Sequence, residues 1–169
     1  RYGLVGSEMC IRDSINGPAA GIGAAYAMAC DLRIMSEEAF ILSVFSNIAL
    51  VPDGGLSWLL ARNIGYSKAL EFAIEAKKIG AQECLQLGIA NKVCSPENLE
   101  SETQKWAQAI SMRSPQAVSN TKKIMRDSLE KKFIQTYEDE ANTQNSILGN
   151  DEFKEGVAAF FEKRKPVFK

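Results

Sequence analysis

The 169-residue sequence contains no histidine, and this absence removes several classes of catalytic site. Without an imidazole, these residues cannot form a Ser-His-Asp triad or a Cys-His pair, and zinc loses its commonest nitrogen ligand. Acid–base chemistry in this chain must therefore come from carboxylates or from Lys, Tyr or Cys side chains. We predict no metal site.

An excess of charge of one sign is also absent, because 20 Lys and Arg residues stand against 21 Asp and Glu residues. This balance gives no basis for bulk attraction to nucleic acid, and every apolar stretch of membrane-spanning length is interrupted by charge. The four cysteines, at positions 10, 30, 84 and 94, form no Cys-x-x-Cys pair. With no recognisable secretory signal, the pattern predicts reduced thiols in a cytoplasmic protein that binds neither nucleic acid nor membrane.

Small residues dominate the stretch Ile15–Cys30, which begins Ile-Asn-Gly-Pro-Ala-Ala-Gly-Ile-Gly. Asn-Gly favours a tight turn, and Gly21 and Gly23 allow backbone N–H groups to approach a ligand closely. The alanine-rich run that follows is predicted to be a buried helix, whose N-terminus would stabilise bound negative charge. The alternative is a glycine-rich turn that only packs against a neighbour, because a lone Gly-x-Gly is a weak signal.

The first half of the chain mixes predicted strands with predicted helices. Short apolar runs, partly β-branched, indicate strands, and proline and glycine punctuate the helices. We predict strands over 31–35, 39–44 and 89–93, and helices over 52–63, 67–76 and 81–87.

The second half is predicted to be entirely helical. Ser95-Pro96 and Ser114-Pro115 each place a capping hydroxyl before a proline at the first helical position. Apolar stripes such as Leu99, Trp106 and Ile110 mean that these helices must pack on another surface. The predicted helices span 96–112, 115–129, 131–148 and 152–164.

Three stretches together resemble the crotonase (enoyl-CoA hydratase/isomerase) superfamily: Ile15–Ile34, Val51–Gly55 and the tail Glu155–Arg164. The resemblance covers about Ile15 to Lys169. It implies an α/β fold, with the C-terminal part of the crotonase (ClpP-like) spiral of β-β-α units over 15–93. An all-helical region over 94–169 would follow, building a trimer interface and contributing to CoA binding.

The first fourteen residues do not share this resemblance. Family members enter the motif through an extended apolar strand, whereas Arg1–Ser14 resembles translated sequencing adapter, and we predict that it is not native. The alternative is a genuine but divergent strand and loop. Family members also carry β-β-α repeats before the motif, so the chain is predicted to be an N-terminally truncated member. The absent part would supply a second oxyanion N–H and much of the CoA groove.

Two glutamates perform hydration in crotonase-type hydratases, and along the resemblance they fall on Ala25 and Phe45. Neither side chain can transfer a proton, so the usual hydratase reaction is not expected. Asp53 remains as the candidate acid–base residue, as in the family's ring-epoxide isomerases of phenylacetyl-CoA catabolism. The alternative is that Asp53 caps a helix by accepting the N–H of Gly55 or Leu56.

The resemblance implies isomerisation of an acyl-CoA, by a double-bond shift or by opening of a ring epoxide. The N–H of Ile22 would hold the thioester oxygen, while Asp53 removes a proton and returns it elsewhere. Three alternatives stay open: a hydratase-like reaction, a hydrolase or dehalogenase in which Asp53 attacks directly, and a catalytically dead member that only binds acyl-CoA.

The remaining site residues are also implied by the resemblance. Ala25, Phe45 and Trp58 are expected to line the substrate pocket, and Gly21, Gly23, Phe160 and Lys163 to contact CoA. The alternative for Trp58 is a core position, and for the two tail residues it is an exposed helix face with a packed Phe. We expect an acyl-CoA substrate, no separate cofactor, and a homotrimer or a dimer of trimers.

Overall fold

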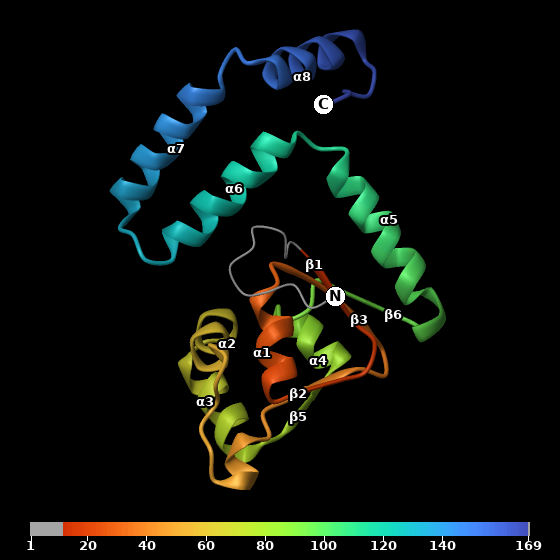
Figure 1. The fold of residues 1–169 in the computed structure, drawn as a ribbon, viewed down its shortest axis with the longest axis vertical. Helices are drawn as coiled ribbons and strands as arrows, with labels where there is room; N and C mark the ends of the chain where they lie inside the picture. The colour runs from red at the N-terminus through yellow and green to blue at the C-terminus, as the bar shows by residue number, and fades with distance from the viewer. Residues whose placement is uncertain (1–11, 169) are drawn as a thin grey trace. The chain divides into compact units, whose positions relative to one another are not determined.

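The computed structural model describes residues 12–168, which belong to two compact units, Arg1–Lys105 and Trp106–Lys169 (Figure 1). The division between the units falls inside helix α5 (Leu99–Ser111), whereas the sequence-based division lies at 93/94. The catalytic candidates Ile22 and Asp53 both belong to the first unit.

Within residues 12–105, the strands form two small sheets. The first is parallel, in the order β1-β3-β6, and the second has the order β2-β4-β5, with β2 parallel and β5 antiparallel to β4. The bounds are β1 Arg12–Ile15, β2 Pro18–Ala20, β3 Leu32–Ser36, β4 Phe40–Leu42, β5 Lys78–Gly80 and β6 Lys92–Cys94.

The order of strands along the chain builds the two sheets together. Strands β1 and β2 enter different sheets, helix α1 (Ile22–Ala29) follows, and β3 and β4 then pair with β1 and β2 in turn. In this register Ile15 lies opposite Met35, and Ala19 lies opposite Ile41. Each pair of consecutive strands therefore adds one strand to each sheet, as the predicted spiral of β-β-α units requires.

Strand β1 includes Arg12, Asp13 and Ser14, which pair with Leu32, Arg33 and Ile34 of β3. These three residues are part of the sheet whatever their origin. Residues 1–11 of the segment predicted to be foreign lie outside the described residues. The foreign origin of 1–14 stays a prediction.

Helix α1 lies at the centre of the first unit (Figure 1), and four of its eight residues are buried. Alanines allow β-strands and neighbouring helices to approach it closely, and burying this apolar surface stabilises the fold by about 25 cal/mol per Å². Helix α2 (Leu56–Ile64) packs against both α1 and α3 (Tyr66–Glu75). The deepest core side chains are Ala24, Ala25, Met28, Met35, Ile41, Leu56, Leu60 and Ile89, with Cys84 of α4 (Ala81–Gln86).

Several predicted boundaries were wrong. Helix α2 begins at Leu56 instead of residue 52, because Gly54 and Gly55 adopt left-handed φ values of 61° and 84° that end any helix at this point. Strands β2 and β5 and the 3-10 helix η1 (Phe45–Ile48) were not predicted. The helix predicted over 96–112 divides into the 3-10 turn η2 (Pro96–Asn98) and α5. The Ser95 side chain does not cap η2.

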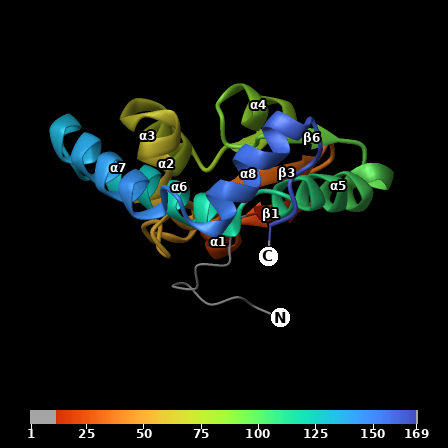
Figure 2. The same ribbon diagram turned by 90° about the horizontal axis from the view of Figure 1, so that it is seen from above.

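The second unit is helical, as predicted, with α6 (Pro115–Ser128), α7 (Phe133–Ile147) and α8 (Asp151–Glu162). The Ser114 hydroxyl accepts the Ala117 N–H at 2.9 Å, which confirms the predicted cap before Pro115. Helices α6 and α7 pack as an antiparallel pair, visible in both ribbon views (Figures 1 and 2). Among the described residues, no helix has both the length and the apolar character to cross a membrane.

Candidate active site

The N-terminus of α1 is shaped by Gly21, which precedes the helix with φ 54° and ψ −121°. Its N–H donates to the Leu42 carbonyl at 2.9 Å, so the start of α1 is fastened to the end of β4. A Cβ at this position would lie 3.3 Å from Cγ2 of Val44, and the positive φ would strain any L side chain. Glycine is required here for the turn itself.

The first helical N–H groups of α1, on Ile22 and Gly23, have no backbone acceptor within residues 12–168. Helices leave such groups unpaired at their N-termini, where the helix dipole also favours negative charge. Beside Gly23, no neighbouring atom of residues 12–168 lies within 4 Å of where a Cβ would stand, so these residues leave this end of α1 open. The arrangement can hold an anionic oxygen.

The segment Asp53–Gly55 comes close to this helix end. A Cβ built on Gly54 would lie 2.5 Å from Cδ1 of Ile22 and 2.9 Å from Cβ of Ala25. The backbone of Gly54 therefore packs directly on the first turn of α1. Asp53, the preceding residue, is held by its carbonyl, which accepts the Leu56 N–H at 3.0 Å.

The Asp53 side chain is exposed, and the part of the chain that the structure describes gives its carboxylate no hydrogen bond or ion pair. The residue at the cap position of α2 is Gly55. The alternative role of Asp53 as a helix cap is therefore wrong, because the turn at Gly54 and Gly55 separates its carboxylate from the helix. Within residues 12–168, Asp53 also has no apolar enclosure, since Asp53 and the nearby Leu50 are both exposed.

Ala25 and Phe45 flank the same end of α1. Ala25 is fully buried in the first turns of the helix, and the Phe45 ring of η1 lies against Gly21. Neither side chain carries an acid or a base. Among the sequence-predicted residues of the first unit, the structure thus groups Gly21, Ile22, Ala25 and Phe45 with the segment that begins at Asp53.

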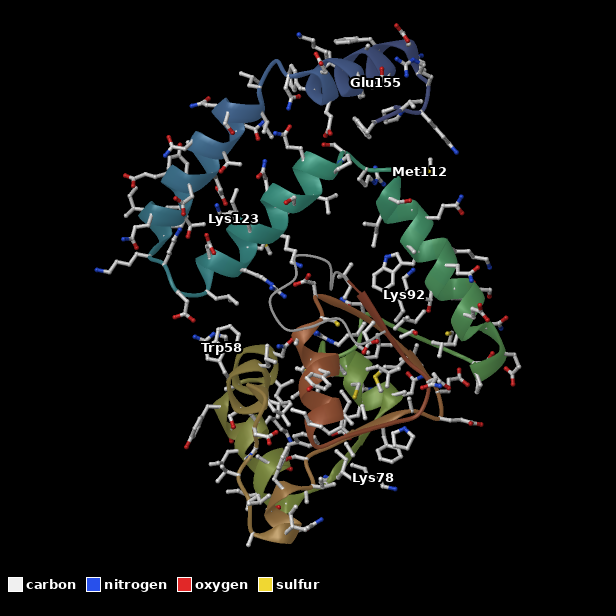
Figure 3. All side chains as sticks on the ribbon, viewed as in Figure 1. Trp58, Lys78, Lys92, Met112, Lys123 and Glu155 are labelled. Carbon is white, nitrogen blue, oxygen red and sulfur yellow. The ribbon has the colours of Figure 1, made fainter. Side chains whose placement is uncertain are left out.

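Trp58 projects from α2 and is 46% exposed (Figure 3). The Arg62 guanidinium lies over its ring, 3.7 Å from the ring centroid, in a cation–π contact. Within the described residues, Trp58 therefore does not occupy a core position, and that alternative is wrong.

Phe160 and Lys163 belong to the second unit. Phe160 is 78% exposed on α8 and packs edge-on against Phe161, with ring centroids 5.6 Å apart. Lys163 ends α8 in a left-handed conformation, with φ 54°. A hollow of about 340 Å³ lies beside Phe160, lined by Val157, Phe161 and Phe168 among others. Phe160 and Lys163 thus lie on an exposed surface of their unit, and their contact with CoA stays a prediction.

Two residues of the first unit escaped the sequence reasoning. Gly54 looked like part of a helix start, and only its contact with Ile22 reveals its role. Arg33 is 5% exposed in β3 and hydrogen-bonds to several elements. A charged residue inside the apolar run Leu-Arg-Ile-Met was the available signal, because a buried charge requires partners.

Comparison with known proteins agrees with the resemblance of the sequence to the crotonase superfamily. The sequence pattern described as Enoyl-CoA hydratase/isomerase matches residues 4–169. The chain is 37% identical over 158 residues to the trans-2-decenoyl-(acyl-carrier-protein) isomerase of Streptococcus mutans, covering 92% of this chain and 59% of that protein. It is 30% identical over 156 residues to the 1,2-epoxyphenylacetyl-CoA isomerase of Escherichia coli, with the same two coverages of 92% and 59%.

Solved structures agree with these sequence relatives. An enoyl-CoA hydratase from Polaromonas superposes with a TM-score of 0.87 at 33% identity, covering 90% of this chain and 60% of that one. An enoyl-CoA hydratase from Bacillus anthracis gives 0.88 at 29% identity, covering 90% and 59%. The chain thus spans about 60% of the length of these proteins and has the crotonase fold. It belongs to the enoyl-CoA hydratase/isomerase family.

Proposed function

We propose that this chain carries the acid–base carboxylate and one oxyanion donor of an acyl-CoA isomerase. The observation that carries the proposal is the contact of Gly54 with Ile22 and Ala25, which brings the segment of Asp53 against the open N-terminus of α1. An anion-stabilising helix end beside a carboxylate without a partner in the described residues suits the formation and collapse of an enolate.

The proposed reaction begins when the thioester oxygen accepts the Ile22 N–H, together with a second N–H that the resemblance predicts from an upstream segment. A C–H bond at the α- or γ-carbon then breaks, its proton passes to Asp53, and its electron pair is delocalised onto the thioester oxygen. The enolate next takes the same proton back at the other carbon. One carboxylate is enough for this transfer, whereas water addition normally uses two proton-transfer groups.

Within residues 12–168, the lack of an acid or base at the two positions that the hydratase pattern gives to glutamate supports isomerisation over hydration. Ala25 and Phe45 are buried apolar residues at the two positions that the hydratase pattern gives to glutamate. Relatives named as isomerases, from Streptococcus mutans and Escherichia coli, are similar to this chain over 92% of its length. An enoyl-CoA hydratase from Pongo abelii is also similar, at 31% identity, so names alone do not decide the reaction.

The proposed substrate is a 3-enoyl-CoA or a ring-epoxide acyl-CoA, as in fatty acid or phenylacetate catabolism, in the cytoplasm. We propose a homotrimer or a dimer of trimers as the assembly. Large exposed apolar side chains on α6–α8 support association: Met125, Leu129, Phe133, Ile134, Tyr137, Phe160 and Phe161. Analytical ultracentrifugation should give a trimer or hexamer mass, and a monomer would contradict the assembly.

The reaction is tested on the protein that contains this chain and the upstream β-β-α segment predicted from the resemblance. Supplied with a 3-enoyl-CoA, it should produce the conjugated 2-enoyl-CoA, which is followed by absorbance and chromatography. Supplied with a 2-enoyl-CoA, it should form little 3-hydroxyacyl-CoA. Rapid hydration without isomerisation would contradict the proposal, a trapped acyl-aspartate would indicate nucleophilic attack, and binding without turnover would indicate an inactive member.

A further inference from the structure

Arg33 is a buried cation in β3 whose guanidinium contacts three separate parts of the first unit. Nη1 donates to the Met28 carbonyl at 3.3 Å and to the Cys30 carbonyl, and Nη2 donates to Oδ1 of Asn63 at 3.2 Å. Nε donates to the Ile89 carbonyl. The guanidinium therefore uses donors on all three of its nitrogens, as its planar fork allows and a lysine ammonium does not.

Three of these four contacts, to Met28, Cys30 and Asn63, fall at the C-terminal ends of the two helices that form the candidate site. Met28 lies in the last turn of α1, Cys30 follows that helix, and Asn63 lies in the last turn of α2. The N-terminal ends of the same helices carry Ile22 and the segment of Asp53. One side chain thus fastens both helices at the ends away from the proposed chemistry.

The charge of Arg33 also suits its position. The carbonyls at a helix C-terminus carry partial negative charge, which a nearby cation stabilises. Burial lowers the pKa of the Arg33 guanidinium, while the neighbouring Cys30, Asp31 and Asp13 raise it. The backbone of Arg33 is held in turn by Asn91, which accepts the Arg33 N–H at 2.8 Å and donates its own N–H to the Arg33 carbonyl at 2.8 Å.

We propose that Arg33 is a positioning residue for the isomerase reaction: by joining the C-terminal ends of α1 and α2, it sets the relation of the Ile22 N–H to the Asp53 carboxylate. The hydrogen bonds of Arg33 to α1 and its hydrogen bond to α2 have separate effects. Its bonds to Met28 and Cys30 orient α1 and hence the thioester oxygen, while its bond to Asn63 holds α2 and hence Asp53. This inference rests on the proposed function.

Two variants separate these parts in the full protein. Asn63→Ala removes the link to α2 but keeps the bonds from Arg33 to α1, and Arg33→Lys keeps the charge but loses the fork. Arg113→Lys is the matched control, because Arg113 is exposed between α5 and α6. The readouts are kcat, the Kd of a saturated acyl-CoA, and the infrared stretch of its ¹³C-labelled thioester carbonyl, which hydrogen bonding at the oxyanion site lowers.

Asn63→Ala should lower kcat about 10-fold through a small displacement of the carboxylate, with Kd and carbonyl stretch unchanged. Arg33→Lys should lower kcat about 100-fold and also shift the stretch back toward that of the free thioester. Arg113→Lys should match the wild type in all three readouts. If Arg33 were merely structural, the variants would change the urea midpoint of unfolding, but Asn63→Ala would not lower kcat while leaving the carbonyl stretch unchanged.

Unchanged kcat in Asn63→Ala would overturn the inference, and this variant decides alone if Arg33→Lys does not fold. An unchanged carbonyl stretch in folded Arg33→Lys would also overturn it. Failure of the proposed function would look different, because the wild-type protein itself would neither isomerise a 3-enoyl-CoA nor lower the carbonyl stretch. The inference about Arg33 would then fail with it.

Discussion

The backbone of Gly54 passes so close to Ile22 that a methyl group on Gly54 would lie 2.5 Å from Cδ1 of Ile22. The Ile22 side chain is 43% exposed and its Cδ1 can turn aside, but Cβ of Ala25, 2.9 Å from the same point, is fixed by α1, and the φ of 61° at Gly54 already favours glycine. This contact joins the turn that carries Asp53 to the helix end that carries the unpaired N–H groups. The proposed site depends on this contact as well as on the hydrogen bonds that hold α1 and α2.

Replacing Gly54 by alanine should therefore displace the Asp53 turn from α1. The left-handed backbone alone costs about 1–2 kcal/mol for a residue with a Cβ, and overpacking adds about 1–3 kcal/mol. Urea denaturation of Gly54→Ala should show both costs, and its affinity for an acyl-CoA should fall.

Gly88→Ala supplies the matched control, because Gly88 has a similar φ of 73° but no neighbouring atom of the described residues within 4 Å of the added Cβ. Gly88→Ala should lose only the stability that the left-handed backbone costs, and its affinity for an acyl-CoA should stay unchanged. Equal losses of stability in the two variants would contradict the close contact between Gly54 and Ile22.

The C-terminal tail should respond to acid through Glu155 of α8 (Figure 3). Its carboxylate accepts hydrogen bonds from Arg164, with one at 2.8 Å, and from the Val167 N–H at 2.7 Å. These bonds, with that from Arg164 first, lower the pKa of Glu155 from 4.5 to about 2. Because the pKa is lowered, the contacts of Glu155 with Arg164 and Val167 are fully stabilising above pH 4.5, and they are lost as the pH falls toward 2.

The amide proton shift of Val167, followed by NMR from pH 6 to pH 2, measures this release. In the wild type it should move with a midpoint well below 4.5, and in Glu155→Gln it should stay at the released position throughout. A wild-type midpoint at 4.5 would mean that Arg164 does not hold this carboxylate.

The thiol of Cys84 should resist alkylation in the folded protein. Burial raises its pKa from 9.0 to about 12, and its sulfur donates to the Ile79 carbonyl at 3.5 Å. Because only the thiolate reacts, this rise lowers the reactive fraction at pH 8 by about 1,000-fold. Peptide-level mass spectrometry after iodoacetamide treatment should find Cys84 unmodified until urea unfolds the chain. Rapid labelling of Cys84 in native buffer would contradict its burial.

The sequence was informative where the local pattern and the tertiary environment agree. The small-residue run after Gly21 forms a helix with one buried face, and Ser114-Pro115 begins a capped helix, because alanine and capping residues have strong local preferences. The resemblance to crotonases then indicated the spiral of strands, which periodicity alone does not reveal in strands as short as Lys78–Gly80.

Tertiary contacts decided the remaining features. The proline at position 52 and the following Asp-Gly-Gly fit a helix start by local rules, yet the approach of Gly54 to Ile22 turns them into a loop. The partners of Arg33 come from Met28, Asn63 and Ile89, which lie far apart in the sequence, so no local pattern predicts them. Asp53 was named from the family resemblance, and its catalytic role stays a prediction.

The most direct test of the central claim compares Asp53→Asn with the wild type in the full protein. Asparagine keeps the size of the side chain but cannot accept a proton, so isomerisation of a 3-enoyl-CoA should slow by about 100-fold or more. The Kd of a saturated acyl-CoA should stay within about twofold, because Asp53 is not proposed to hold the thioester oxygen. Asp151→Asn, a change at a fully exposed aspartate of α8, should keep wild-type turnover. Full isomerase activity in Asp53→Asn would contradict the account.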